Sequence, residues 1–336
     1  MSVWQYVINR VLLTIPMLFV LLVIIFLVLR VMPGDPCLAM LGGRNVGAER
    51  IDQCRVEHGF DEPIYVEFVD YLGNIVQGDF GESLRTGRPV IQEIFLKFPA
   101  TLELAIFGMI LATFMGITSG MIGATHSDRP LDHMMRVFNI GAFSIPIFWM
   151  GLIFLMVLAV PLDFFPTGTR LSSDVSLQRI TGFHVIDSIV QGNWAALGSA
   201  LKHLILPGIT LGLILSGFIG RMTRANMLEV LGQDYIRTAR AKGLAQRVVN
   251  NKHALRNALI PVTTVVGLEF ALLMSGAVLT ETVFSWPGMA RYLLVSINAR
   301  DFLAIQGTIV FIAIFIMTIN MLVDIAYSFL DPRVRY

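Results

Sequence analysis

Long apolar runs that carry no charged side chain constrain the fold of this chain more than any other feature of its sequence. Four such runs are bounded by charged residues, at Arg10–Arg30, Arg136–Asp163, Lys202–Arg221 and Asp301–Asp324. A helix that crosses the hydrocarbon core of a bilayer needs roughly 17–25 predominantly apolar residues, and each run is long enough. The sequence therefore predicts a membrane protein.

The composition agrees with this prediction and excludes other classes of protein. Of the 336 residues, 55% are hydrophobic and 15% are charged, whereas an average soluble domain carries about 25% charged residues. The formal net charge is only +1. The chain therefore lacks the strongly basic balance of a nucleic-acid-binding domain, and no nucleic-acid partner is expected.

Two further apolar stretches contain isolated acidic residues and bring the predicted number of spans to six. We expect an all-α polytopic membrane protein with transmembrane helices near 10–31, 100–124, 136–160, 203–221, 258–283 and 304–328. The first stretch is too long for the core of a signal peptide, and no small-residue cleavage pattern follows it. Residues 1–31 are therefore expected to form an uncleaved N-terminal transmembrane helix.

An even number of spans places both termini on one side of the membrane. The loop at 125–136, the basic loop at 221–256 and the tail favour the cytoplasm for that side, since short cytoplasmic loops are enriched in Lys and Arg. Residues 32–99 are too polar to span and are expected to form a small extracytoplasmic segment. Residues 100–330 then form a five-helix core, and 331–336 form a cytoplasmic tail.

Both cysteines of the chain, Cys37 and Cys54, fall in the expected extracytoplasmic segment. Thiols in an oxidising compartment often pair, which would close a loop between these two positions. Two unpaired thiols are the alternative, because a sequence cannot show that two side chains meet.

Three acidic residues lie in or near the expected spans, at Glu103, Glu269 and Glu281. A charged side chain at the bilayer centre costs about 2.5–3.5 kcal/mol on insertion scales, so such residues are candidates for function. Glu103 and Glu281 are expected near the outer interface, and Glu269 deeper. We select Glu269 and Glu281 as candidates for the translocation pathway; a purely structural role and proton coupling are the other interpretations of Glu269.

Small residues recur at every fourth position in three of the expected spans. They are Gly116 and Gly120; Gly208, Gly212, Ser216 and Gly220; and Gly267, Ala271 and Ser275. Such stripes let helix backbones approach closely in lipid. They predict either packing within one subunit or a face that lines a pathway or a subunit interface.

The polar loop between the fourth and fifth expected spans has helical periodicity. Its apolar residues over 226–242 follow one stripe, at Met227, Leu228, Leu231, Tyr235 and Ala239. Gly243 suits a left-handed conformation that ends a helix, and a second short helix is expected over about 245–257. The stripe and the glycine break favour docking into a groove of a partner protein. A basic loop that lies on anionic lipid is the alternative.

The motif RTARAKGL at 237–244, with HALRNALIPV at 253–262, resembles the cytoplasmic EAA loop of ABC-transporter permeases, in the branch that imports dipeptides, oligopeptides and nickel. Arg237 and Thr238 stand where the general motif has glutamate and alanine, whereas Ala239 and Gly243 match it. The resemblance covers nearly the whole chain, through MPGDP at 32–36, GDFGESLRTGRPV at 78–90, FPATLEL at 98–104, SIPIFWMGL at 144–152, LTETVFSWPGMARYL at 279–293 and DPRVRY at 331–336.

The resemblance implies a type I ABC importer permease fold in the inner membrane of a prokaryote. It implies a second, related permease subunit, two cytoplasmic ATPases that bind ATP and Mg²⁺, and an extracytoplasmic solute-binding protein. The loop at about 222–257 would insert a coupling helix into a groove of an ATPase. The residues implied in this coupling are Asp234, Tyr235, Arg237, Thr238, Ala239, Arg240, Ala241, Lys242, Gly243 and Leu244.

The chain itself is not expected to be an enzyme or to bind a cofactor or metal. It has no G-x-x-x-x-G-K-[ST] phosphate-binding motif, no H-E-x-x-H pair and no G-x-S-x-G elbow. We expect a peptide importer, while importers of nickel chelates, glutathione or oligosaccharides in the same branch stay open as alternatives. From a different class, the alternative is a secondary transporter that uses Glu269 for proton coupling.

Overall fold

The computed structural model describes residues 3–31, 37, 47–57, 62–161 and 164–330. Within these ranges the structure contains helices and no β-strand, apart from an isolated bridge between Glu82 and Pro89. The all-α prediction is confirmed. The expected tail and most of residues 32–46 lie outside the described residues.

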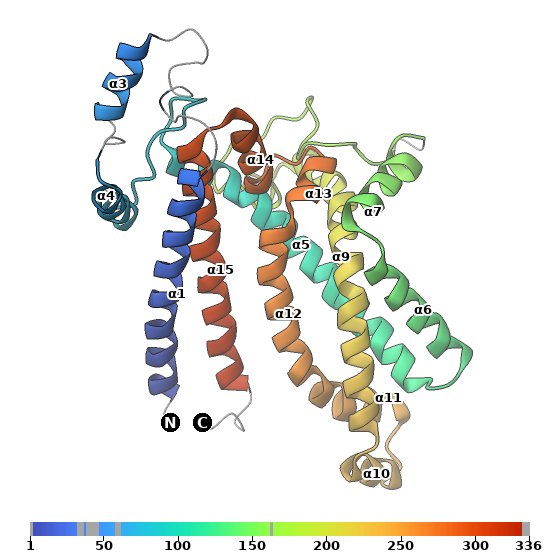
Figure 1. Cartoon of the computed structure of the whole chain (residues 1–336). Helices are drawn as coiled ribbons and strands as arrows, with labels where there is room; N and C mark the ends of the chain where they lie inside the picture. The colour runs from blue at the N-terminus through green and yellow to red at the C-terminus, as the bar shows by residue number, and fades with distance from the viewer. Residues whose placement is uncertain (1–2, 32–36, 38–46, 58–61, 162–163, 331–336) are drawn as a thin grey trace.

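Five helical stretches of the described chain are long and apolar enough to cross a membrane. They make up the whole or most of α1 (Val3–Val31), α5 (Val90–Thr125), α9 (Trp194–Leu231), α12 (Arg256–Gly276) and α15 (Phe302–Leu330). These stretches correspond to five of the six predicted spans. In Figure 1 the first turn of α1 and the last turn of α15 lie at the same end of the bundle.

The third predicted span is not one continuous helix. Its first part is α6 (Pro130–Ser144). Its second part is α7 (Ile147–Phe154), which continues into a π-helical turn η1 (Leu155–Ala159). The second part is bent by 103° relative to the first. Ile145 is extended at the break, with φ of −86° and ψ of 129°, because a residue that precedes proline is pushed out of the helical conformation. Counted as one broken span, this pair brings the number to six.

The fifth predicted span, over 258–283, also differs in its boundaries. At its first end α12 continues directly from α11 (Gln246–Val248) and the π-helical η2 (Val249–Leu255), so the expected short helix and the span form one rod. At the other end α12 stops at Gly276, and a separate helix α13 (Val278–Val283) follows.

The core of the bundle is the long contact between α5 and α9. A Cβ atom at Gly120 would lie 2.6 Å from the carbonyl oxygen of Gly220, so the backbones touch where their small residues meet. Leu104, Leu211 and Ile219 are buried in the same cluster. These two stripes of small residues therefore serve packing within one subunit.

Short helices gather at the end of the bundle where α1 stops and α15 begins (Figure 1). They are α3 (Ala48–Glu57), α4 (Ile64–Val76), α8 (His184–Val190), α13 and α14 (Met289–Ala299). A disulfide joins Cys37 to Cys54 of α3. At the opposite end, the polar loop between α9 and α12 projects from the bundle (Figure 1).

Candidate functional site

The polar loop between α9 and α12 folds into a helical elbow that extends beyond the rest of the bundle (Figure 1). After α9, Gln233 is extended with ψ of 151°, and α10 (Asp234–Ala241) starts directly after it. Gly243 then has φ of +74°, and its N–H donates to the carbonyl of Arg240 at 2.9 Å. The left-handed conformation expected of Gly243 is confirmed.

Two apolar side chains anchor α10 to the rest of the chain. Ile236 and Ala239 are buried against Met227 of α9 and against Val249 and Ala254 of η2. Full burial of an isoleucine side chain contributes about 1.5–3 kcal/mol. The elbow is therefore attached both to α9 and to the rod that continues into α12.

The predicted apolar stripe is wrong in one position. The stripe over 226–242 assumes one helical phase, but the chain turns at Gly232, directly after α9 ends. The turn resets the helical phase, so that Ile236 is buried in place of Tyr235, which is 43% exposed. The Tyr235 hydroxyl accepts a hydrogen bond from Asn257 at 2.7 Å. The apolar face of α10 is thus used on its own chain.

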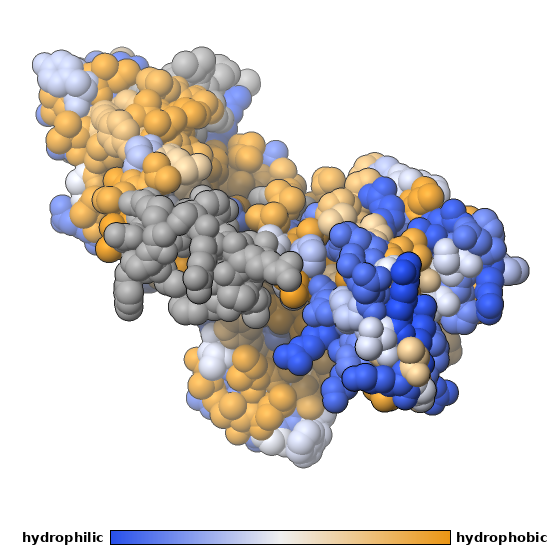
Figure 2. All heavy atoms as spheres, turned by 90° about the horizontal axis from the view of Figure 1, so that it is seen from below, coloured by the Kyte–Doolittle hydropathy of each residue, from blue (hydrophilic) through white to orange (hydrophobic). Residues whose placement is uncertain are grey.

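The remaining predicted coupling residues form an exposed outer face with three basic side chains and one acidic side chain. They are Asp234, Arg237, Thr238, Arg240, Ala241, Lys242, Gly243 and Leu244. The ion pair between Arg237 and Asp234, 3.3 Å long and solvent-exposed, is of a kind worth only about 0–1 kcal/mol. Figure 2, which shows the molecule from this end, has hydrophilic residues gathered over the elbow and hydrophobic residues over neighbouring helices. The outer face is free to contact a partner.

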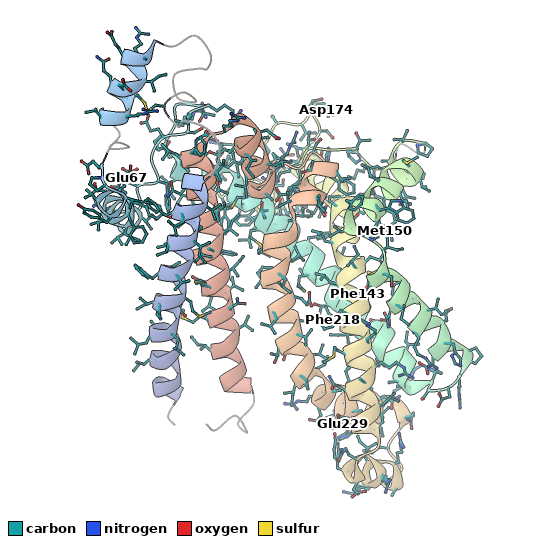
Figure 3. The ribbon with its side chains drawn as sticks, viewed as in Figure 1. Glu67, Phe143, Met150, Asp174, Phe218 and Glu229 are labelled. Atoms are coloured by element: carbon teal, nitrogen blue, oxygen red, sulfur yellow. A yellow bond between two sulfur atoms is a disulfide. The ribbon has the colours of Figure 1, made fainter. Side chains whose placement is uncertain are left out.

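A buried ion pair braces the helices beside the elbow. Asp132 at the start of α6 is fully buried and accepts two hydrogen bonds from Arg224 of α9, at 2.6 and 2.7 Å. Further along the same two helices, Phe143 and Phe218 lie next to each other, with ring centroids 6.3 Å apart (Figure 3). The two parallel hydrogen bonds between Arg224 and Asp132 add geometric specificity, so α6 has a defined position on α9.

The other end of the bundle is closed by an outer cap, which consists of residues 164–193 together with α13 and α14. Its centre is a buried ion pair in which Arg170 donates to Glu103 of α5 at 2.5 Å. The backbone N–H of Val185 donates to the same carboxylate at 2.8 Å. Burial lowers the pKa of the Arg170 guanidinium, and the Glu103 carboxylate opposes this effect. The cap is thereby tied to α5.

A second buried carboxylate ties α13 and α14 to α5. Glu281 is fully buried and accepts hydrogen bonds from the Thr101 hydroxyl at 2.5 Å and from the backbone N–H of Arg291 at 2.9 Å. Thr101 in turn accepts from the N–H of Met289 at 2.8 Å. The Trp286 indole donates to the carbonyl of Ala100 at 2.8 Å. Glu281 therefore holds three helices together.

Asp187 of α8 organises the loop of the cap. Its carboxylate accepts from the N–H groups of Ile180, Thr181 and Gly182 at 3.2, 2.8 and 3.0 Å, and from the Thr181 hydroxyl at 2.6 Å. Burial of Asp187 acts to raise its pKa, but the hydrogen bonds from Thr181 and the neighbouring N–H groups outweigh it, so the pKa is lowered. Asp187 is therefore held as an acceptor-only carboxylate.

Comparison with known proteins decides the family. The family described as "Binding-protein-dependent transport system inner membrane component" matches residues 112–336, and its N-terminal companion matches 3–105. This chain belongs to that family of ABC-importer permeases. It is a multi-pass membrane protein with a permease fold of five or six spans.

Curated relatives of this permease match it over nearly their whole length. The dipeptide transport system permease protein DppB of Haemophilus influenzae is 44% identical, covering 99% of this chain and 100% of that protein. The di/tripeptide transport system permease protein DppB of Pseudomonas aeruginosa is 42% identical, covering 99% of both. The glutathione transport system permease protein GsiC of Escherichia coli O1:K1 / APEC is 37% identical over 99% of both.

The two pathway candidates of this permease lie in different surroundings. Glu269 lies on α12 and is half-buried, whereas Glu281 lies inside the outer cap and reaches no surface. The structure does not bring the two carboxylates together in one site. Within the described residues, no group of three or more His, Cys, Asp or Glu side chains could hold a metal ion.

Several structural residues of the permease were missed in the sequence. The ion pairs of Arg170 with Glu103 and of Arg224 with Asp132 have no signal in the sequence, because each joins residues that lie far apart in the chain. Ile236 could have been found from the turn signal at Gly232, since a break there changes which residues share a face.

Proposed function

We propose that this permease is a membrane subunit of an ATP-driven importer of di- or oligopeptides, to which an extracytoplasmic binding protein delivers the solute. Relatives that are 42% and 44% identical over almost the whole chain carry di/tripeptide and dipeptide in their names. The relative named for glutathione, which is itself a short peptide, is 37% identical. These similarities favour a peptide over a nickel chelate or an oligosaccharide.

The geometry of the elbow carries the proposed coupling role. Ile236 and Ala239 attach α10 to its own chain, which leaves Arg237, Arg240 and Lys242 exposed for an acidic or polar groove of an ATPase. ATP and Mg²⁺ would bind to that ATPase subunit. Because α10 packs on both α9 and η2, a displacement of α10 would move two spans together, which is how rigid elements transmit domain closure.

The same proposal places the elbow and both termini in the cytoplasm of a prokaryotic cell and the chain in its inner membrane. A second, related permease subunit would complete the translocation pathway, and two ATPase subunits would engage one elbow each. The outer cap would then face the binding protein, and residues 32–99 would lie on the same side of the membrane.

The coupling role is tested by substitutions at Gly243 in the complete complex, reconstituted in liposomes. Proline locks φ near −65°, which is incompatible with the φ of +74° found here, so Gly243→Pro should abolish ATP-driven peptide uptake. Gly243→Asn is the matched control, because asparagine tolerates the left-handed conformation and a Cβ at this position meets nothing within 4 Å. Normal uptake by the proline variant at equal membrane abundance would refute coupling through the elbow.

The proton-coupled alternative is separated by a second measurement. If Glu269 couples uptake to protons, uptake should survive ATP depletion and stop when the proton gradient collapses, and Glu269→Gln should abolish it. We expect the opposite pattern, in which uptake requires ATP and Glu269→Gln still transports.

A further inference from the structure

The amphipathic helix α4 (Ile64–Val76) has a face with no partner in this chain. Tyr65, Val69 and Val76 are 70%, 64% and 87% exposed, and they lie on one line along the helix, at i, i+4 and i+11 spacing. Leu72, at the edge of this line, packs against the cluster of Leu22, Ile25 and Val310. The polar residues Glu67, Asp70, Asn74 and Gln77 follow a second line on the opposite side of the helix, where Glu67 is buried and the other three are exposed. One side of α4 is therefore apolar and exposed, while the opposite side is polar.

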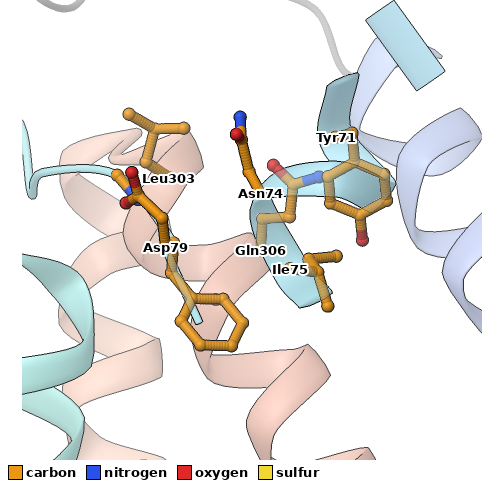
Figure 4. A pocket seen from close by; sticks show the side chains of 9 residues that line it. Tyr71, Asn74, Ile75, Asp79, Leu303 and Gln306 are labelled. Atoms are coloured by element: carbon orange, nitrogen blue, oxygen red, sulfur yellow. The ribbon is translucent and has the colours of Figure 1, made fainter. Parts of the chain in front are cut away.

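The third side of α4 fixes the helix against two spans. Phe68 contacts Phe19 and Phe26 of α1, with ring centroids 5.9 and 5.2 Å apart, and Tyr71 stacks on Phe26 at 5.5 Å. On the side of α15, Tyr71, Asn74 and Ile75 line a cavity of about 120 Å³ together with Gln306 (Figure 4). The position of α4 is thus set by contacts with both α1 and α15.

The axis of α4 lies across the spans. In Figure 1 the helix is seen almost end-on, beside the upright α1. The apolar window of α1 ends at Val28. At about 1.5 Å per residue, Phe26 and Phe19 lie about 3 and 14 Å inside that end. Since Phe68 contacts both rings, α4 lies at a depth between them, within the apolar window and near its outer end.

We propose that α4 is an interfacial helix whose exposed stripe, Tyr65, Val69 and Val76, is inserted among the lipid acyl chains of the leaflet next to the outer cap. Helices with this pattern lie in the plane of the membrane, with the apolar face about 5–10 Å into the boundary between headgroups and acyl chains. Phe19, Val20 and Ile24 of α1, the span against which α4 packs, are also about half exposed, as expected where a helix faces lipid.

The polar line of α4 explains which side of the helix faces away from the acyl chains. Asp70 and Gln77 are exposed on the side opposite the stripe, so insertion of the stripe leaves them toward the headgroups and water. An embedded α4 would anchor the segment between α1 and α5 at a defined depth in the membrane. Insertion of α4 depends on this helix and on the spans beside it, whatever solute the permease carries.

Site-directed spin labelling of the complete transport complex in lipid nanodiscs tests this proposal. Both cysteines of the chain form a disulfide, so Val69→Cys introduces a thiol that can take a nitroxide label. Asp70→Cys is the matched control on the polar line, and signal from the unsubstituted complex is subtracted. The accessibility of the label to oxygen, which partitions into lipid, is compared with its accessibility to a water-soluble nickel chelate.

We expect oxygen to relax the label at position 69 more strongly than the nickel chelate does, and the reverse at position 70. Tyr65→Cys and Gln77→Cys repeat the comparison on the two lines, so that one poorly folded variant does not decide the result. A label at 69 that is relaxed more by the nickel chelate would show that the stripe faces water. Protection of position 69 from both reagents would show that a protein partner covers it. Either of these outcomes overturns the proposal.

Discussion

The two ends of this permease are held by different kinds of interaction. In the outer cap, several charged and polar side chains are buried and bind other parts of the same chain, as in the contacts of Arg170 with Glu103 and of Glu281 with Thr101. In the elbow, Ile236 and Ala239 are the buried residues of α10, and its charged side chains remain exposed.

This difference separates a region that is complete within the chain from one that is available to a partner. Buried polar groups are directional and costly to leave unpaired, so a network like that of the cap specifies one arrangement. Exposed charges make weak contacts within the chain and keep their hydrogen-bonding capacity for another protein. The outer cap therefore has the construction of a structural closure, and the elbow that of a docking element.

The largest effect is expected from breaking the central pair of the cap. Arg170→Ala leaves the carboxylate of Glu103 buried without its cation, which typically destabilises a protein by about 3–5 kcal/mol. Thermal unfolding of the purified chain in detergent should show a clear drop in Tm. Arg179→Ala is the control, because Arg179 is exposed and donates only to the carbonyl of Phe95. Equal losses for both variants would contradict a special role of the buried pair.

A comparable local effect is expected in the elbow, but with a different readout. Ile236→Ala removes the buried anchor of α10, and such truncations cost about 2–5 kcal/mol. Because α10 projects from the bundle, we expect peptide-stimulated ATP hydrolysis and uptake by the complete complex to fall, with little change in the Tm of the bundle. Leu244→Ala, at an exposed apolar position, is the matched truncation for stability. A large loss of Tm in Ile236→Ala would show that the elbow is part of the core.

A smaller and pH-dependent effect is expected at Asp187. Asp187→Asn keeps the shape of the side chain but places an NH₂ group opposite backbone N–H donors, which costs about 1–3 kcal/mol. Since folding lowers the pKa of Asp187, its stabilising contribution is present above the unfolded pKa of about 3.9 and is lost as the pH falls through the folded pKa. The difference in Tm between the native chain and the variant should thus be largest near neutral pH and shrink below about pH 4. A pH-independent difference would exclude the charge as its cause.

The smallest effect is expected from Tyr235→Phe. This change removes the hydroxyl that accepts from Asn257, a bond that joins α10 to α12 across the exposed surface of the elbow. A hydrogen bond of this kind contributes about 0.5–1.5 kcal/mol. Hydrogen exchange of the α10 backbone should become faster, while uptake should change less than in Ile236→Ala. Loss of uptake as large as that of Ile236→Ala would place the hydroxyl itself in the coupling contact.

Most of the bundle could be predicted from the sequence because lipid demands long apolar runs. The five continuous spans and the helix, glycine and helix order of the elbow follow from local composition and spacing. The break in the third span has a local cause at Pro146. A proline alone does not predict a break, however, because α1 continues through Pro16. Bends of this kind depend on what neighbouring helices offer the freed backbone groups.

The sequence by itself determined that the chain crosses the membrane, where its polar loops fall and which family it belongs to, because these properties depend on local apolar length and on motifs. Only the tertiary structure decided which polar residues meet. Glu281 and Thr101 are 180 positions apart, and Glu103 and Arg170 are 67 apart. It also decided that Ile236 is buried in place of Tyr235, since a single turn at Gly232 changes the helical phase. Burial and pairing arise from the contact of distant segments, which no local pattern encodes.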